Sequence, residues 1–347
     1  MQLQPDSYRK VNESFSKTMI YHVGVDCGMF VEINRLINAI LYCLSRRVRF
    51  KLYSRDANFG TGIGWTEYFL PFCDEVEDSF HKKYNYQRLP SWRRIMRLCR
   101  NQKSIGPVVW KLKSIAKNFI GHCKAYQVYK ERVLLSQDVP SQPDEHYRIP
   151  ELGIDCSYNE AYEMVAGMVW HFNAELAREE QEYRHRLHLP AVYDAIHVRG
   201  GDKVMETELI DGSRIIQTLS PDDGTTVFVL TDDYRQFREL QSKFPNLTFK
   251  TTCRPDEKGY HHKAFVNSSP SEKRKTIARL LISVDLLLNS RGFVGSITTG
   301  PSVFVMKRRL SEASVLAVDC PKEELASTLS LTIDARAAIS MRNVSAT

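Results

Sequence analysis

The chain has 347 residues, of which 43% are apolar and 26% are charged, and its formal net charge is +7. This composition is typical of a soluble globular protein, and the length suits two compact domains better than one. No stretch approaches the ~20 consecutive apolar residues of a membrane-spanning helix, so such a helix is not expected. Residues 1–17 are polar and show no secretory signal, so we expect a cytoplasmic protein.

The eight cysteines are scattered along the chain, and no two of them form a Cys-x-x-Cys pair. This distribution argues against a zinc site and against a disulfide framework. We therefore expect reduced thiols, as is usual for a cytosolic protein.

The N-terminal part of the chain predicts a β-α-β unit. A strand is expected at 20–25, and the helix expected at 30–44 carries apolar residues at helical spacing. A second strand is expected at 48–53. We expect the two strands to be parallel and the connection between them to be right-handed.

Residues 79–130 form a basic insert. They include thirteen Lys and Arg, from Lys82 to Lys130, and no Asp or Glu, so the insert is more positive than the whole chain. The sequence pattern predicts two helices in this region, separated near Gly106 and Pro107.

The basic insert has three interpretations: a solvated cationic face, a nucleic-acid interface, or a docking surface for an anionic membrane leaflet or an acidic glycan. No recognised RNA-binding or DNA-binding fold accompanies it, so nucleic acid is not the expected partner. Trp92, Trp110 and Phe119 lie among the cations, as in helices that bind at membrane interfaces. We favour docking of residues 82–130 on an anionic surface, which would make the protein peripheral on a membrane.

The second half of the chain predicts a parallel sheet. A long amphipathic helix is expected at 158–187, before Pro190. Beyond it, strands and helices alternate, which indicates a sheet covered on both faces. The expected strands are 192–198, 226–230, 247–251, 292–295 and 315–318, and the expected helices are 234–244, 272–289 and one that ends at 306.

These elements predict an α/β fold with two Rossmann-like domains that face a cleft. The N-terminal domain is expected at 18–155, with the basic insert inside it. A connecting helix at 156–189 leads to a C-terminal domain at 190–322. Residues 323–347 are expected to form a tail.

Three polar segments follow expected strands of the C-terminal domain, where parallel sheets bind their ligands. They are 197–203, 231–233 and 296–302. In the first, Arg199 lies beside two glycines, and an arginine in this position can hold a phosphate with two parallel bonds. The third precedes a helix, whose free N–H groups and dipole attract anions. The second and third are equally common as ordinary helix caps.

Together the three segments resemble motifs of the fucosyltransferase superfamily that contains α-1,6-fucosyltransferases, bacterial nodulation fucosyltransferases and protein O-fucosyltransferases. Residues 197–204, His-Val-Arg-Gly-Gly-Asp-Lys-Val, are similar to the family's His-Val-Arg-Arg-x-Asp-Lys-Val. Residues 227–233 resemble its second motif, and 293–299 resemble its Phe-hydrophobic-Gly-Thr-Phe-Ser-Ser. The resemblance is good over 190–302, fainter over 20–72 and absent in the basic insert.

The resemblance implies an inverting transfer of fucose from GDP-fucose to a glycan hydroxyl on a GT-B scaffold, with no metal or other cofactor. Arg199 would hold the β-phosphate and stabilise the leaving GDP. The implied donor-binding residues are His197 and Asp285 near guanine, Thr298 and Thr299 at the diphosphate, and Asp202, Lys203, Asp232 and Asp233 from the first two motifs. Gly28 would lie on the acceptor side.

The chain departs from the family pattern at two places. Gly200 replaces a second arginine, so one phosphate contact is missing. Glu206 and Glu208 flank the expected position of a catalytic base, and either carboxylate suits proton abstraction from a hydroxyl. The alternative interpretation is that both are solvated surface carboxylates with no catalytic role.

The main residues of the predicted site could also have purely structural roles. Arg199 would instead form an ion pair with Asp202 or Asp232, and Asp202 would then orient the arginine. His197 would instead be an ordinary hydrogen-bonded strand histidine.

Two alternative functions remain open at this point. One is a GT-B transferase that uses another GDP-sugar, such as GDP-mannose. The other is a catalytically silent glycan-binding protein, which the missing second arginine favours. The acceptor, the linkage formed and the oligomeric state do not follow from the sequence.

Overall fold

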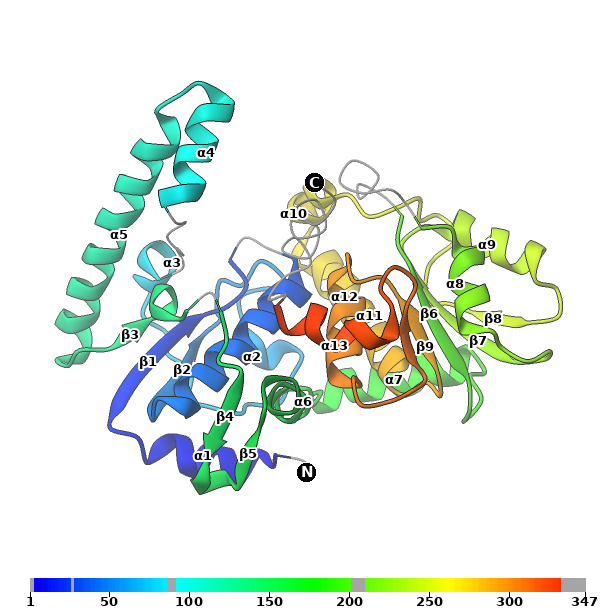
Figure 1. Ribbon diagram of the computed structural model, residues 1–347, viewed down its shortest axis with the longest axis horizontal. Helices are drawn as coiled ribbons and strands as arrows, with labels where there is room; N and C mark the ends of the chain where they lie inside the picture. The colour runs from blue at the N-terminus through cyan, green and yellow to red at the C-terminus, as the bar shows by residue number, and fades with distance from the viewer. Residues whose placement is uncertain (1–2, 26–27, 86–91, 141, 201–209, 332–347) are drawn as a thin grey trace.

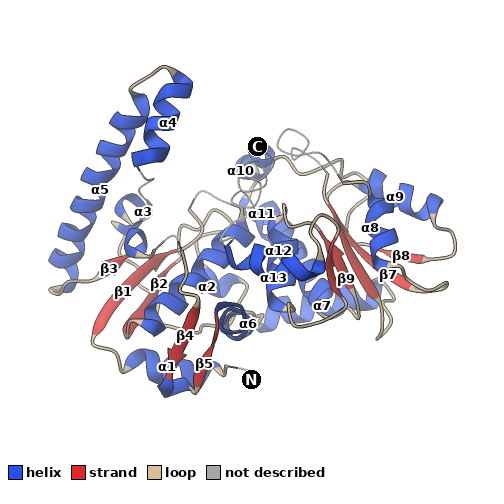
Figure 2. Cartoon of the chain, viewed as in Figure 1, coloured by secondary structure: helices blue, strands red, loops and turns tan. Residues whose placement is uncertain are grey.

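The computed structural model describes residues 3–25, 28–85, 92–140, 142–200 and 210–331. It has a mixed α/β fold in which the strands gather in two groups with helices between them (Figure 2). Over these ranges, no helix combines the length and the apolarity needed to cross a bilayer. The cysteines within them are free thiols, as expected.

The N-terminal sheet is parallel, with β1 (Lys17–His22) between β2 (Val48–Tyr53) and β3 (Leu134–Leu135). Helix α2 (Met29–Ser45) connects β1 to β2 and buries its apolar face. The predicted β-α-β unit is confirmed, although β1 begins and ends three residues before the predicted range 20–25.

The sequence does not predict helix α1 (Pro5–Glu13), which is short and polar. Its residue Asn12 fixes it to the N-terminal sheet. The Asn12 side-chain N–H donates to the Phe50 carbonyl oxygen (2.9 Å), and the Asn12 side-chain oxygen accepts from the Phe50 N–H (2.7 Å). The amide thus pairs with β2 as the backbone of a neighbouring strand would.

The basic insert contains α3 (His81–Tyr84), α4 (Trp92–Gln102) and α5 (Gly106–Tyr129). Helices α4 and α5 pack side by side and project from the body of the molecule (Figure 1); we call them the basic arm. The predicted separation of two helices near Gly106 is confirmed. Pro107 lies in the first turn of α5, where its missing N–H removes no helical hydrogen bond.

The connection to the C-terminal half differs from the prediction. An antiparallel hairpin of β4 (His146–Ile149) and β5 (Ile154–Ser157) precedes the helical region. The single helix predicted at 156–189 is wrong, because α6 (Tyr158–Val169) ends before α7 (Ala174–Arg186) begins.

The interruption between α6 and α7 has a physical cause. Asn173 caps α7 by accepting a hydrogen bond from the Leu176 N–H (2.9 Å). The Leu70 N–H donates to the His171 carbonyl oxygen (2.7 Å), and the Asn173 N–H donates to the Tyr68 carbonyl oxygen (2.9 Å). The backbone between the two helices therefore forms hydrogen bonds with the loop at 68–70 instead of continuing a helix. Sequence periodicity does not reveal such contacts between distant segments.

The C-terminal sheet is parallel, with the strand order β10-β9-β6-β7-β8. Its strands are β6 (Asp194–Val198), β7 (Thr226–Thr231), β8 (Thr248–Lys250), β9 (Phe293–Gly295) and β10 (Val315–Ala317). The helices of this half are α8 (Gly212–Leu219), α9 (Tyr234–Lys243), α10 (His262–Asn267), α11 (Pro270–Leu288), α12 (Gly300–Arg308) and α13 (Lys322–Leu331). The predicted strands are confirmed, whereas α8 and α10 are not predicted and α13 begins what the sequence suggests is a tail.

One apolar core runs between the two sheets. A single cluster of buried side chains includes Met19 in β1 and Phe293 in β9. At its centre Phe30 of α2, Trp170 and Phe304 of α12 form an aromatic junction. The ring centroids of Trp170 and Phe304 are 4.7 Å apart, and those of Phe30 and Phe304 are 5.4 Å apart. Because the core is shared, the predicted domain boundaries stay a prediction.

Helix α12 also buries a lysine. The Lys307 ammonium group donates to the Tyr158 hydroxyl (3.1 Å) and lies over the rings of Tyr158 and Tyr162. Burial disfavours its charged form and lowers the pKa of Lys307 to about 7.

We predict that Lys307→Met stabilises the protein most strongly below pH 7. There the wild-type chain buries a charged ammonium group, and replacing it with an apolar side chain of similar length should gain about 1–4 kcal/mol. Between about pH 7 and pH 10, the unfolded wild-type chain holds a proton that the folded chain lacks, so wild-type stability rises and the gain shrinks. Denaturant unfolding of both proteins at pH 6 and pH 9 checks this; equal differences at the two pH values would contradict it.

Candidate functional site

The strand order of the C-terminal sheet identifies where a ligand is expected to bind. The chain builds β6, β7 and β8 in one direction and then returns to place β9 and β10 on the other side of β6. In such doubly wound sheets, ligands bind beyond the carboxyl ends of the strands at the point where the order reverses. Here that point lies between β6 and β9. Arg199 directly follows β6, and residues 296–299 directly follow β9, so both segments lie beside this point.

His197, the fourth residue of β6, is buried at this edge. Its Nδ1 lies 2.7 Å from the Ser302 Oγ and 3.3 Å from the Thr299 Oγ1. Burial and the neighbouring Arg199 charge lower the pKa of His197 to about 3, so the ring is neutral. The structure thus gives His197 the hydrogen bonds of an ordinary strand histidine, while it ties β6 to the start of α12.

Arg199 follows β6 directly and lies at the carboxyl edge. Its Nη1 forms an ion pair with the Asp232 Oδ2 at 2.9 Å, and its side chain remains 28% exposed. The guanidinium carbon lies 5.4 Å from the centre of the Tyr260 ring. The ion pair with Asp232 that the sequence allows is therefore present, and the donor-binding role of Arg199 stays a prediction. The pair holds a partly exposed cation beside the point where the strand order reverses.

Asp232 has a wider positioning role. Its Oδ1 accepts from the Gly200 N–H (2.7 Å), and its Oδ2 accepts from the Tyr260 N–H (3.0 Å) as well as pairing with Arg199. The Asp232 carboxylate, which follows β7, thus holds the backbone at Gly200, after β6, and at Tyr260, after β8.

Asp233 acts as a helix cap. Its Oδ1 accepts from the Arg235 N–H (3.0 Å), and its Oδ2 pairs with the Arg235 Nη2 (2.6 Å). These contacts lower the pKa of Asp233, chiefly through the hydrogen bond from the Arg235 side chain. The structure supports the capping interpretation of Asp233 and shows no contact between its carboxylate and Arg199 among the described contacts.

Gly200 packs tightly against the start of α9. A Cβ atom at this position would lie 2.9 Å from the Asp233 Cβ and 3.2 Å from both the Asp232 Oδ1 and the Gln236 Nε2. A side chain here would require the turn at 232–236 to move. This close approach is the physical reason why an arginine does not fit at position 200.

The turn at 296–299 is held by its own hydroxyl groups. The Ser296 Oγ lies 2.6 Å from the Thr298 Oγ1 and accepts from the Thr298 N–H (3.1 Å). Thr299 precedes α12, and its hydroxyl donates to the Ser296 carbonyl oxygen (3.2 Å). The first turn of α12 has N–H groups without intrahelical partners, so the turn presents N–H groups and a helix dipole to an anion.

Asp319 supports this turn, and the sequence does not predict its role. Its Oδ2 accepts from the Ser296 hydroxyl (2.8 Å) and its Oδ1 accepts from the Ile297 N–H (3.0 Å). It follows β10, so it lies at the same edge of the sheet. The sequence shows that Asp319 follows an expected strand, which favours a place at the ligand-binding edge. It does not show which residues Asp319 contacts.

The structure does not bring Asp285 to the other predicted residues. It lies in the last turn of α11, which leads to the amino end of β9, the opposite edge of the sheet. There it accepts from the Trp170 ring N–H (2.9 Å), and burial raises its pKa. Asp285 therefore does not lie with Arg199 and the turn at 296–299, because α11 runs back along the sheet, and its guanine-side role stays a prediction.

Gly28, which is predicted to lie on the acceptor side, directly precedes a helix turn that packs against the start of α12. Gly28 is exposed at the start of α2, and a Cβ atom there would meet no other atom within 4 Å. In the same first turn, Phe30 packs against α12, where a Cβ atom on Gly300 would lie 3.1 Å from the Phe30 Cβ. The first turns of α2 and α12 therefore meet.

Four predicted residues, Asp202, Lys203, Glu206 and Glu208, lie outside the described residues. Their predicted roles stay predictions. Over the part of the chain that the structure describes, no three His, Cys, Asp or Glu side chains are grouped to hold a metal ion, and the expectation of no metal cofactor likewise stays a prediction.

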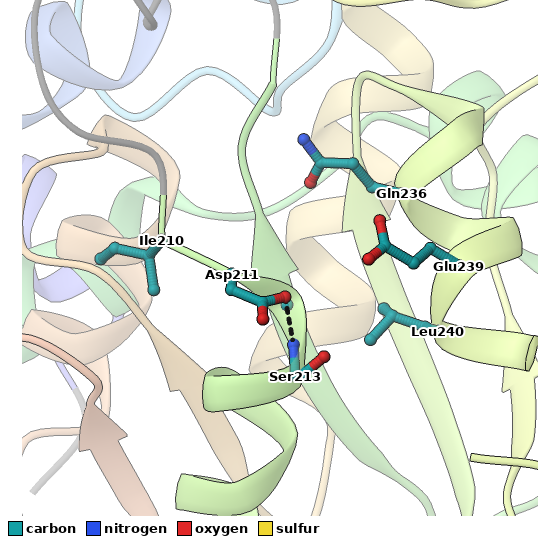
Figure 3. Close-up of a pocket in the computed structure, with 7 residues that line it drawn as sticks. Ile210, Asp211, Ser213, Gln236, Glu239 and Leu240 are labelled. Atoms are coloured by element: carbon teal, nitrogen blue, oxygen red, sulfur yellow. Dashed lines mark hydrogen bonds between the residues drawn. The ribbon is translucent and has the colours of Figure 1, made fainter. Parts of the chain in front are cut away.

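A small cavity lies between the start of α8 and one side of α9 (Figure 3). Its volume is about 170 Å³, and it is lined by Ile210, Asp211, Gly212, Ser213, Gln236, Glu239 and Leu240. Ligand pockets usually measure roughly 300–1,000 Å³. The carboxylates of Asp211 and Glu239 also oppose an anion. This cavity is therefore not the expected diphosphate site.

No protein-family profile matches the chain, and no curated protein matches it. Among solved structures, the fucosyltransferase NodZ from Bradyrhizobium matches with 14% identity and a TM-score of 0.50, covering 88% of this chain and 97% of that chain. The NodZ α-1,6-fucosyltransferase co-crystallised with GDP matches with 13% identity, 85% and 93% coverage and a TM-score of 0.47. POFUT1 in complex with GDP matches with 10% identity, 87% and 97% coverage and a TM-score of 0.43. The chain has the fold of the fucosyltransferase NodZ, with two parallel sheets in the GT-B arrangement.

Proposed function

We propose that the protein transfers fucose from GDP-fucose to a glycan hydroxyl, with inversion at the sugar carbon and without a metal ion. One observation carries the proposal: Arg199 and the first turn of α12 flank the point where the strand order of the C-terminal sheet reverses. The motif resemblance at 197–204 and 293–299 and the fold shared with a fucosyltransferase support the same activity.

The proposed chemistry follows from the charge that develops during transfer. The bond between the fucose carbon and the β-phosphate oxygen breaks, and a bond from that carbon to the acceptor oxygen forms on the opposite face. The leaving diphosphate gains negative charge, which the Arg199 guanidinium, the hydroxyl groups of Thr298 and Thr299, and the α12 N–H groups would stabilise.

The acceptor hydroxyl must lose its proton during the transfer. We propose that Glu206 or Glu208 takes it, as a carboxylate general base within reach of the acceptor would. The acceptor glycan would lie on the side of Gly28, because the first turn of α2 meets the first turn of α12.

Calorimetry with GDP, followed by GDP-fucose, tests the donor. We expect saturable binding of GDP with one site per chain and much weaker binding of GMP, which lacks the β-phosphate assigned to Arg199. Addition of EDTA should leave the GDP affinity unchanged. A folded protein that gives no binding signal with GDP would refute the proposal, and binding that requires Mg²⁺ would refute its metal-independent form.

Two other functions are distinguished by related measurements. A transferase for another GDP-sugar would bind GDP equally well but would release GDP from GDP-mannose rather than GDP-fucose. A catalytically silent glycan-binding protein, which the absence of a second arginine at position 200 favours, would bind glycan without binding GDP.

We also propose that residues 82–130 bind an anionic surface, which would make the protein peripheral on a membrane. The thirteen cations of the basic insert, without a single Asp or Glu among them, support an anionic partner.

A further inference from the structure

Helix α5 of the basic arm has an inverted arrangement of side chains. Amphipathic helices of globular proteins normally bury their apolar face. The buried side chains of α5 are small or polar, namely Lys111, Ser114, Asn118, Gly121 and Ala125. These positions repeat every three or four residues, so they form one continuous face, which packs against α4 and α3.

The opposite face of α5 is apolar and exposed. Leu112 is 54% exposed and Phe119 is 70% exposed, with Ile115 and Ile120 exposed beside them. Leu112, Ile115 and Phe119 follow the spacing of one helix face. We call this face, with Val109 and Tyr126 at its ends, the apolar stripe of α5.

The apolar stripe belongs to a larger concentration of exposed apolar side chains. Of the fifteen large apolar side chains that are exposed among the described residues, eleven lie between Trp92 and Val128, on the basic arm and its turn. Scattered exposed apolar residues are ordinary, but a continuous apolar surface normally marks a binding site.

Cations border the apolar stripe. Lys113, Lys117 and Lys124 occur at intervals of four and seven residues, so they form one row along α5, next to Val109 and Ile120. On α4, Arg93, Arg97 and Arg100 are exposed as well. An apolar face bordered by lysines is the arrangement of helices that lie in the plane of a membrane interface.

The basic arm presents both cations and exposed apolar side chains, and a suitable partner must bind both. A second copy of the chain would bring another thirteen cations against the first thirteen, which is unfavourable. A nucleic acid or an acidic glycan would neutralise the cations but would offer little to the exposed leucine and isoleucine side chains. An anionic bilayer satisfies both, because its head groups attract the lysines and its acyl chains take up the apolar groups.

We propose that the apolar stripe of α5 docks on the surface of an anionic lipid bilayer. The inference deepens the proposal that residues 82–130 bind an anionic surface, and it is independent of the proposed transfer reaction because it uses residues on α4 and α5 alone. Helix α5 lies on the bilayer, with the stripe in the head-group region and Lys113, Lys117 and Lys124 at the lipid phosphates.

The base of the arm is fixed to the N-terminal sheet, so docking also orients the rest of the protein. The Tyr129 hydroxyl donates to the Asp78 Oδ2 (2.5 Å) and lies 2.9 Å from the His81 Nε2. The Asn85 side chain donates to the carbonyl oxygen of Ile20 in β1 (2.9 Å). Burial lowers the pKa of His81 to about 4, so the His81 ring is neutral near pH 7.

Vesicle co-sedimentation with the full chain tests the proposal. We expect binding to vesicles that contain phosphatidylglycerol and little binding to vesicles of phosphatidylcholine alone. The double variant Leu112→Ser/Phe119→Ser should lower the partition constant by about tenfold or more, because it removes two large apolar side chains from the middle of the stripe. Lys113→Gln and Lys117→Gln should each lower it by about fivefold on the anionic vesicles.

A matched control is available outside the basic arm. Val192→Ser changes an apolar residue that is 63% exposed in the C-terminal half, and it should leave vesicle binding unchanged. Thermal unfolding of each variant shows whether the fold is retained. Loss of GDP binding in the wild-type protein would affect the proposed function and not this inference.

Three results would overturn the proposal. The first is absence of binding to phosphatidylglycerol vesicles, or equal binding to neutral vesicles. The second is wild-type binding by the folded Leu112→Ser/Phe119→Ser variant. The third is a lipid-free dimer in sedimentation equilibrium that this variant abolishes, which would identify a second copy as the partner of the stripe.

Discussion

Replacing Arg199 by alanine should lower kcat for fucose transfer by about 10²–10³-fold, the usual effect of removing one donor that stabilises a developing anion. GDP affinity should fall as well, because Asp232 would lose the cation that pairs with it at 2.9 Å and its carboxylate would repel the diphosphate. The fold should persist, since Asp232 keeps its hydrogen bonds from the Gly200 and Tyr260 N–H groups. Steady-state kinetics with GDP-fucose and calorimetry with GDP measure the two effects.

The neighbouring pair of Asp233 and Arg235 provides the matched control for Arg199. Arg235→Ala also removes an arginine from an ion pair, but this side chain is 72% exposed and its partner Asp233 is the N-cap of α9. We expect Arg235→Ala to leave transfer almost unchanged. Arg199→Lys should recover only part of the activity, because an ammonium group does not form two parallel bonds. Full turnover by a folded Arg199→Ala protein would remove the role assigned to this residue.

Replacing Phe304 by alanine should lower the free energy of unfolding by about 3–5 kcal/mol, which is the usual cost of deleting a fully buried aromatic side chain. Phe304 is buried between Phe30 and Trp170 in the aromatic junction, so the cavity would open where the two sheets share their core. Urea unfolding followed by circular dichroism measures the loss. A change below ~1 kcal/mol would show that the junction collapses around the smaller side chain.

Phe304→Leu is the control for this prediction, because it keeps an apolar side chain in the junction and should cost less than Phe304→Ala. The alanine variant should also weaken GDP binding, since Phe304 holds α12 and the first turn of α12 faces the expected diphosphate site. Unchanged GDP affinity in a destabilised but folded variant would separate the junction from the site.

The C-terminal sheet could be predicted from the sequence because its strands are short apolar runs that end in polar turns. This pattern alone predicts that the segments at Arg199, Asp232 and Thr299 lie at one edge of the sheet, and the structure brings them there. Parallel strands leave few alternatives, since each run must be buried on both faces.

Other features depend on contacts between distant segments. The break between α6 and α7 depends on bonds to the loop at 68–70, and Asp319 finds its partners only when β10 lies beside β9. In α5, periodicity indicates a helix with an apolar face but does not tell which face the protein buries. The structure shows that the polar and small face is buried, around Ser114 and Gly121.

Helix α12 links properties that are often carried by separate elements. Its first turn borders the expected ligand crevice, Phe304 in its middle completes the aromatic junction, and Lys307 near its end is buried against Tyr158. We therefore expect the two halves of the chain to unfold together, since unfolding of either half would expose this helix. A nucleotide bound at one end of α12 would stabilise the whole molecule as one cooperative unit through mass action.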